Sequence, residues 1–146
     1  AGSGTSDVSE TIVITNNRTT PLEISFFQYS DFDLGGTITD ATVKFGGFNN
    51  NTATQNDISV AIAETILTPA PTAVEVNLFP VTRTALEDNA ITNLNNNPGP
   101  IGPGDLTWAV QWDLVIAPGQ FDLARILRKR VGAPVIDYAL TIDIEP

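Results

Sequence analysis

The sequence predicts an all-β protein, a single β-sandwich domain over residues 1–146, with about eight strands in a jelly-roll or Greek-key-like arrangement. Three observations support this prediction. Apolar residues recur mainly with a period of two, as on a strand with one buried face. Turn signals rich in Gly, Pro and Asn recur roughly every 8–15 residues. Hydrophobic residues make up 42% of the chain and charged residues 16%, a balance that favours a packed core over disorder.

The first strand is expected within residues 1–15, where Val8, Ile12 and Ile14 share a face that Glu10 interrupts. The body of the domain then covers residues 16–131. Its first half is predicted to hold strands at residues 22–29, 37–45, 58–67 and 73–79, separated by loops at 16–21, 46–51 and 68–71. The strand at 22–29 carries apolar residues on both sides, which indicates burial of both faces in places.

The second half begins with one predicted helical turn at residues 82–89, followed by a polar loop at 93–104. Residues 108–116 then alternate without a break and form the strongest predicted strand. The spacing at 121–127 fits either a strand or a short helix. After a Gly-Ala-Pro hinge at 132–134, a last strand is expected at 135–144. Its apolar face consists of Ile136, Tyr138, Leu140, Ile142 and Ile144.

Composition also narrows the function. The chain has no Cys, which excludes disulfides and thiol nucleophiles, and no His, the commonest general base, so we expect a protein that is not an enzyme. Paired carboxylates remain the one hydrolytic alternative among the 17 acidic residues. The net charge of −10 argues against nucleic acid as a partner, and no apolar run is long enough to span a membrane.

The first residues, Ala-Gly-Ser-Gly at 1–4, resemble the small-residue stub that signal peptidase leaves. A secreted protein, extracellular or on the cell surface, is therefore expected.

Asp31 and Asp33, with Gly35 and the nearby Asp40, form a candidate Ca²⁺ site because alternating carboxylates on a tight turn suit a hard cation. A solvated acidic turn is the alternative, since the closing Glu of a twelve-residue calcium loop is missing. No other cofactor is expected.

The aromatic residues Trp108 and Trp112 are candidates for a sugar-stacking platform, and Phe27 and Tyr29 are weaker ones. Because the two tryptophans share a face with Val110 and Leu114, a core position is favoured.

Two further surface features stand out. Asn17 and Asn50 fit the N-glycosylation acceptor pattern. Four of the seven basic residues cluster near the end of the body and suggest either a patch for self-association or an ordinary basic strand end; they are Arg125, Arg128, Lys129 and Arg130.

Two segments resemble those of secreted PEP-CTERM proteins of environmental bacteria: FFQYSDFDLGGT at residues 26–37 and GPGDLTWAVQWD at 102–113. The TPAP stretch at 68–71 and LFP at 78–80 lie between them in the expected order, and the similarity covers residues 7–130. The resemblance implies export, sorting by an exosortase that acts on a C-terminal Pro-Glu-Pro, hydrophobic and basic tail, and association with extracellular polysaccharide and biofilm. It implies no catalytic residues. The chain departs from the family pattern because it ends at Glu145-Pro146, without the hydrophobic and basic part of the tail. Two explanations are open: the tail was removed on maturation, or it never existed.

The resulting hypothesis is a structural subunit of an extracellular filament or matrix that polymerises head-to-tail with copies of itself. The strand at 135–144 would complete the sheet of a neighbour, with the N-terminal strand at 8–15 as the other possible donor. The alternative is a non-catalytic carbohydrate-binding β-sandwich module of the matrix, with extracellular polysaccharide as the partner.

Overall fold

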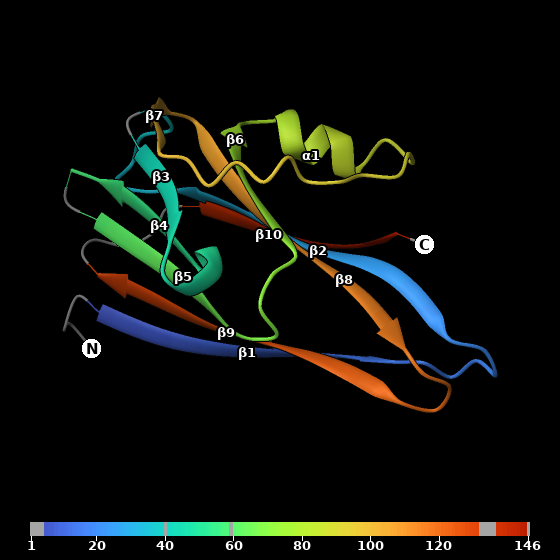
Figure 1. Ribbon diagram of the computed structural model, residues 1–146. Coiled ribbons are helices and arrows are strands. Elements are labelled where there is room, and N and C mark those ends of the chain that lie inside the picture. The colour runs from blue at the N-terminus through green and yellow to red at the C-terminus, as the bar shows by residue number, and fades with distance from the viewer. Residues whose placement is uncertain (1–4, 40, 59, 132–136, 146) are drawn as a thin grey trace.

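A computed structural model of the chain describes residues 5–39, 41–58, 60–131 and 137–145, which form two antiparallel β-sheets packed face to face (Figure 1). The prediction of an all-β sandwich is confirmed. The strands are β1 (Thr5–Thr15), β2 (Leu22–Asp33), β3 (Ala41–Gly46), β4 (Thr52–Asp57), β5 (Val60–Thr68), β6 (Ala73–Leu78), β7 (Ile101–Gly104), β8 (Leu106–Ile116), β9 (Phe121–Val131) and β10 (Asp137–Glu145). A 3₁₀ turn, η1 (Phe48–Asn50), and a short helix, α1 (Val81–Leu86), complete the described secondary structure.

The larger sheet has the strand order β1-β9-β5-β4-β3-β7, and the smaller one β10-β2-β8-β6. The pairs β1–β9, β2–β8 and β3–β7 are nested, as in a jelly roll. The first and last strands are both edge strands, one in each sheet. Ile14 of β1 and Ile144 of β10 line one pocket of about 330 Å³, so the two edges adjoin on the same side of the sandwich.

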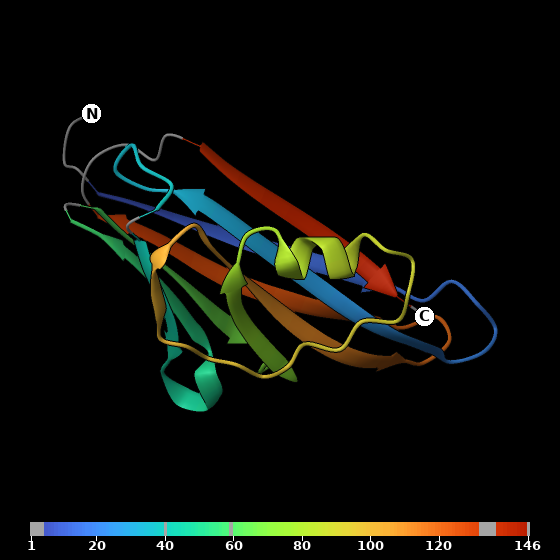
Figure 2. The same cartoon turned by 90° about the horizontal axis from the view of Figure 1, so that it is seen from above.

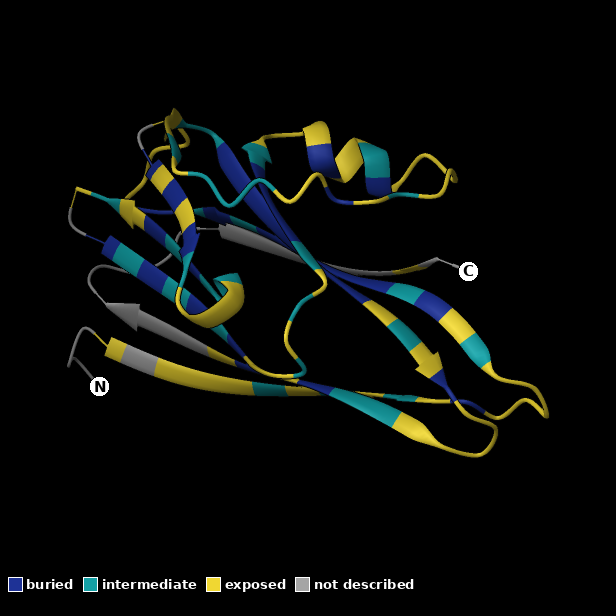
Figure 3. Cartoon of the chain, in the orientation of Figure 1, coloured by how far each residue is buried: buried dark blue, intermediate teal, exposed yellow. Residues whose placement is uncertain are grey.

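The main core lies between the sheets, where alternation along each strand places the apolar residues (Figure 3). Two aromatic stacks connect β2 with β8 in this core. Phe26 stacks on Trp112 with ring centroids 5.3 Å apart, and Phe32 stacks on Trp108 at 5.2 Å. Both tryptophans are only 1% exposed, so the prediction of core positions for them is confirmed.

A second apolar cluster lies on the outer face of the smaller sheet, which α1 and the segment after it cover (Figure 2). Phe27, Tyr29 and Ala109 of the sheet pack there with Leu86 and Leu94. This cover explains why β2 is buried on both faces, as its sequence predicted. No helix in the described part of the chain is long and apolar enough to cross a membrane.

The strand predictions differ from the structure in several places. β2 continues to Asp33, so Asp31 and Asp33 lie on a strand and not on the predicted turn. Residues 52–57 form a separate strand, β4, and residues 101–104 form β7 inside the stretch predicted as loop. β4 was not predicted because its sequence is polar and lacks an alternating apolar face. A core position is occupied by Gln55, whose Nε2 donates to the Phe32 carbonyl at 2.7 Å. β3 begins at Ala41 rather than at residue 37, and the ambiguous segment at 121–127 belongs to a strand, β9.

Candidate functional site

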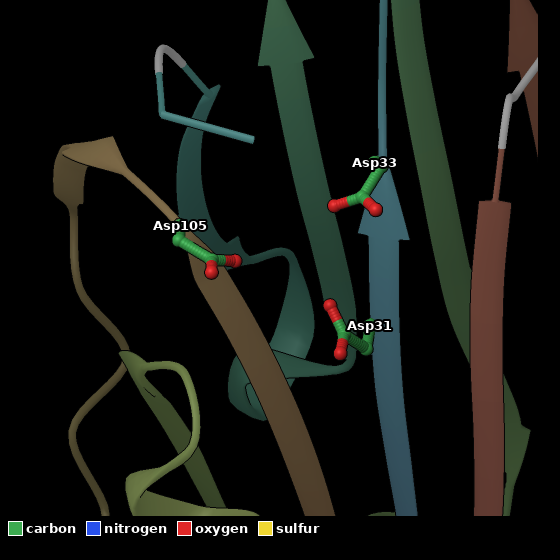
Figure 4. A group of neighbouring side chains, drawn as sticks. All are labelled: Asp31, Asp33 and Asp105. Atoms are coloured by element: carbon green, nitrogen blue, oxygen red, sulfur yellow. The ribbon is translucent and has the colours of Figure 1, made fainter. Parts of the chain in front are cut away.

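Three aspartates converge at the end of the smaller sheet where β2 stops and β8 starts (Figure 4). Asp31 and Asp33 are two residues apart on β2 and therefore share a face. Asp105 is the residue just before β8. It lies near Asp31 because the antiparallel β2–β8 register pairs Asp31 with Thr107, two residues further along. One carboxylate oxygen from each residue lies within 4.8 Å of the others, and all three residues are half-buried. We call this group the aspartate corner.

The aspartate corner contains two of the three residues predicted as calcium ligands. Asp40, the third, lies outside the described residues. Asp105 was missed because it is distant from the others in sequence and follows Gly104 in what reads as a loop. Only the antiparallel register of β2 and β8 brings it to this site.

The electrostatics of the aspartate corner favour a cation. Two unit negative charges about 4 Å apart repel each other by roughly 1 kcal/mol in water and about 4 kcal/mol near a protein surface. A bound divalent ion reverses the sign of this interaction, and carboxylate oxygens are the ligands that Ca²⁺ prefers.

Calcium at the aspartate corner is expected to raise thermal stability. For an affinity typical of extracellular calcium modules, about 2 mM Ca²⁺ raises the melting temperature by roughly 3–7 °C, and a chelator reverses the effect. The Asp105→Asn variant should lose this response, because one carboxylate ligand is gone. Differential scanning fluorimetry measures both effects.

The control for this prediction is Asp7→Asn, which makes the same charge change at an exposed position on β1, in the other sheet. It should keep the full calcium response. Equal responses of Asp105→Asn and the native chain would contradict a site at this corner.

Tyr29 lies two residues before Asp31 on β2 and is 1% exposed in the outer cluster. Burial raises the pKa of the Tyr29 hydroxyl to about 12, and the Asp31 and Asp105 carboxylates add to the rise, while Arg83 opposes it. The phenol therefore stays neutral in the folded chain at pH values where an unfolded tyrosine is ionised.

This difference predicts a loss of stability in alkali. Between pH 10 and 12 the folded state keeps the Tyr29 proton and the unfolded state releases it, so the free energy of unfolding falls as the pH rises through this range. Denaturant titrations across the range should show a shallower decline for Tyr29→Phe, which has no phenolic proton to hold. Identical declines for the two proteins would contradict a raised pKa at Tyr29.

The predicted donor strand lies on the edge of the smaller sheet. β10 pairs antiparallel with β2 of its own chain, in a register that joins Tyr138 to Phe32, Leu140 to Ser30, Ile142 to Gln28 and Ile144 to Phe26. All four β2 partners are buried. Ile136 lies outside the described residues, and Ile144 is about half exposed.

The remaining predicted positions are separated from one another. Phe27 and Tyr29 are buried, as are Trp108 and Trp112. None of the four aromatic residues predicted as stacking candidates therefore presents a ring face to a sugar in solution. Asn17 is exposed in the turn between β1 and β2, and Asn50 is half-buried in η1. Of the basic residues on β9, Arg125 is exposed; the register places Arg128 opposite Glu64 of β5, Lys129 opposite Ala63 and Arg130 opposite Ile62.

No model of a known protein family matches the chain, and no curated protein matches it in sequence. The resemblance to PEP-CTERM proteins therefore stays a prediction.

Proposed function

We propose that the protein is a structural subunit of an extracellular filament or matrix, which assembles by donating β10 to the β2 edge of a neighbouring copy. The observation that carries the proposal is the position of β10. It is on a sheet edge, and its one partner in the described sheet is β2. Removal of β10 would leave the order β2-β8-β6 intact and open the edge of β2.

The chemistry of that edge fits a donated strand. Main-chain hydrogen bonds along β2 are the same whether β10 comes from its own chain or from another, so exchange between copies changes few contacts. The β2 residues opposite β10 are buried, so the register of the joint matters: side chains alternate between the two faces of a strand, and a slip by one residue exchanges the face that meets them. Without a strand, the β2 edge is an open template for pairing.

A pair of engineered cysteines tests the proposal, because the native chain contains none. Ser25 and Glu145 are register partners at the end of the β2–β10 ladder. Facing residues in an antiparallel pair lie about 4.5–5.5 Å apart between Cα atoms, within the span of a disulfide. In the Ser25→Cys/Glu145→Cys variant, oxidation should produce a ladder of covalent oligomers on a non-reducing gel.

The single variants Ser25→Cys and Glu145→Cys serve as controls and should give no species larger than a dimer. A double variant that forms only monomers with an internal disulfide would contradict strand donation. That result would mean that β10 stays on its own chain.

The alternative function is carbohydrate binding. The aromatic platform predicted for it, Trp108 and Trp112, is buried in the core. A polar cleft elsewhere in the molecule favours a sugar site of a different kind. The two functions are compatible, because a matrix subunit can polymerise through one surface and bind polysaccharide through another.

A further inference from the structure

A polar cleft of about 250 Å³ lies between η1, the start of β6 and the loop that precedes β7. Its lining consists of three asparagines, Asn49, Asn50 and Asn96, together with residues 71–74. The loop around Asn96 runs back along β6 (Figure 2), where Val76 N donates to the Asn97 carbonyl at 2.8 Å. The cleft is therefore built from segments that hydrogen bonds fix to the sandwich.

The asparagines of this region fall into two groups. Asn51 and Asn97 anchor the backbone: Asn51 Nδ2 donates to the Ile66 carbonyl at 3.2 Å, and Asn97 Nδ2 donates to the Val76 carbonyl at 3.3 Å. By contrast, the side-chain amides of Asn49, Asn50 and Asn96 make no hydrogen bond to any residue that the structure describes. The anchoring asparagines hold the loops, and the three others line the cleft without a hydrogen-bond partner among the described residues.

The backbone singles out the same three residues. Among the described residues, four that are not glycine adopt a positive φ, and all four are asparagines. Three of them line the cleft, with φ of 53° at Asn49, 54° at Asn50 and 56° at Asn96; the fourth, Asn89, does not. Left-handed backbone is costly for most residues, and such conformations cluster at functional sites. Its concentration in one cleft is an observation independent of the free amides.

The composition of the cleft specifies the class of ligand. An asparagine amide offers two donors and one acceptor, which matches the mixed donor and acceptor pattern of neighbouring hydroxyl groups. No charged side chain lines the cleft, although the chain carries a net charge of −10.

From these observations we infer that the cleft binds a neutral, hydroxyl-rich ligand, namely one sugar unit of a neutral polysaccharide. The inference does not depend on strand donation, because the cleft involves neither β10 nor the β2 edge.

Isothermal titration calorimetry of the full chain with dextran, laminarin and galactomannan tests the inference, with the anionic polysaccharide alginate alongside. We expect saturable binding to at least one neutral polymer and none to alginate. The Asn96→Gly and Asn50→Gly variants remove an amide, while glycine keeps the left-handed backbone without strain. Each should weaken binding by about tenfold or more, the loss of one good hydrogen-bonding group.

The matched control is Asn89→Gly, which makes the same change at the left-handed asparagine outside the cleft. It should leave the affinity unchanged, and the melting temperatures of all three variants should stay close to that of the native chain. Two results would overturn the inference: no binding to any of the three neutral polymers, or equal affinities for Asn96→Gly and Asn89→Gly.

Discussion

A chain truncated after Val131, and therefore without β10, should form no filaments and should lose most of its stability. The strand is predicted to carry an apolar face, and a large aliphatic side chain contributes about 1.5–3 kcal/mol when fully buried; Ile144 is half exposed and contributes less. The loss of a few such contributions is large against a typical total of only about 5–15 kcal/mol for a whole domain. Loss of β10 also leaves a row of β2 backbone groups without partners.

A synthetic peptide of residues 135–144, added during refolding, should restore the truncated chain. The peptide supplies the same ladder to β2 in trans, so circular dichroism should show a cooperative thermal transition that is absent without it. A peptide of equal composition in which the apolar residues no longer alternate is the control and should have no effect, because its apolar residues cannot all reach one face. Electron microscopy of the intact and truncated chains completes the experiment.

Two outcomes would contradict this prediction. A truncated chain with the stability of the intact one would show that β10 contributes little to the sheet. Isolated particles from the intact chain under all conditions would show that β10, whatever its contribution to stability, does not link copies.

The sequence predicted the strands that alternate, because alternation is a local signal. β8 and β10 were predicted as strands for this reason. The burial of Trp108 and Trp112 was predicted because they share a face with apolar residues. β4 was missed because Gln55 takes a core position that pattern analysis assigns to an apolar residue. β7 was missed because its sequence, Ile-Gly-Pro-Gly, reads as a turn.

The candidate sites were harder to predict, because each depends on contacts between distant segments. Asp31 and Asp33 were recognised as a pair, whereas Asp105 joins them only through the register of β2 and β8. The asparagines of the cleft were interpreted as turn residues, which is correct for their backbone. Their free amides become visible only when η1 and the loop around Asn96 are seen to face one space.

A buried carboxylate carries the second large effect. Glu64 of β5 is 1% exposed and faces the core between the sheets, where Gln28 and Ser30 of β2 approach it. Gln28 Nε2 donates to Glu64 Oε1 at 3.0 Å, and the Ser30 hydroxyl donates to Oε2 at 3.4 Å. Both donors are themselves buried. Glu64 therefore connects the two sheets through polar contacts inside the core.

Replacement of Glu64 by alanine is expected to destabilise the protein by about 3–5 kcal/mol, measured by chemical denaturation. The change leaves the Gln28 and Ser30 donors in the core without their acceptor, and it opens a cavity between the sheets. Glu64→Gln keeps the volume and one acceptor oxygen, so its loss of stability should be clearly smaller. The matched control is Glu23→Ala on β2, an exposed position where the same truncation should change stability by less than about 1 kcal/mol.

The two Glu64 variants separate shape from charge. The register places Arg128 of β9 opposite Glu64. If Glu64→Gln loses as much stability as Glu64→Ala, the negative charge is the essential property, and hydrogen bonds to Gln28 and Ser30 are secondary. If Glu64→Ala loses no more than Glu23→Ala, the polar connection between the sheets contributes nothing to stability, and the prediction is wrong.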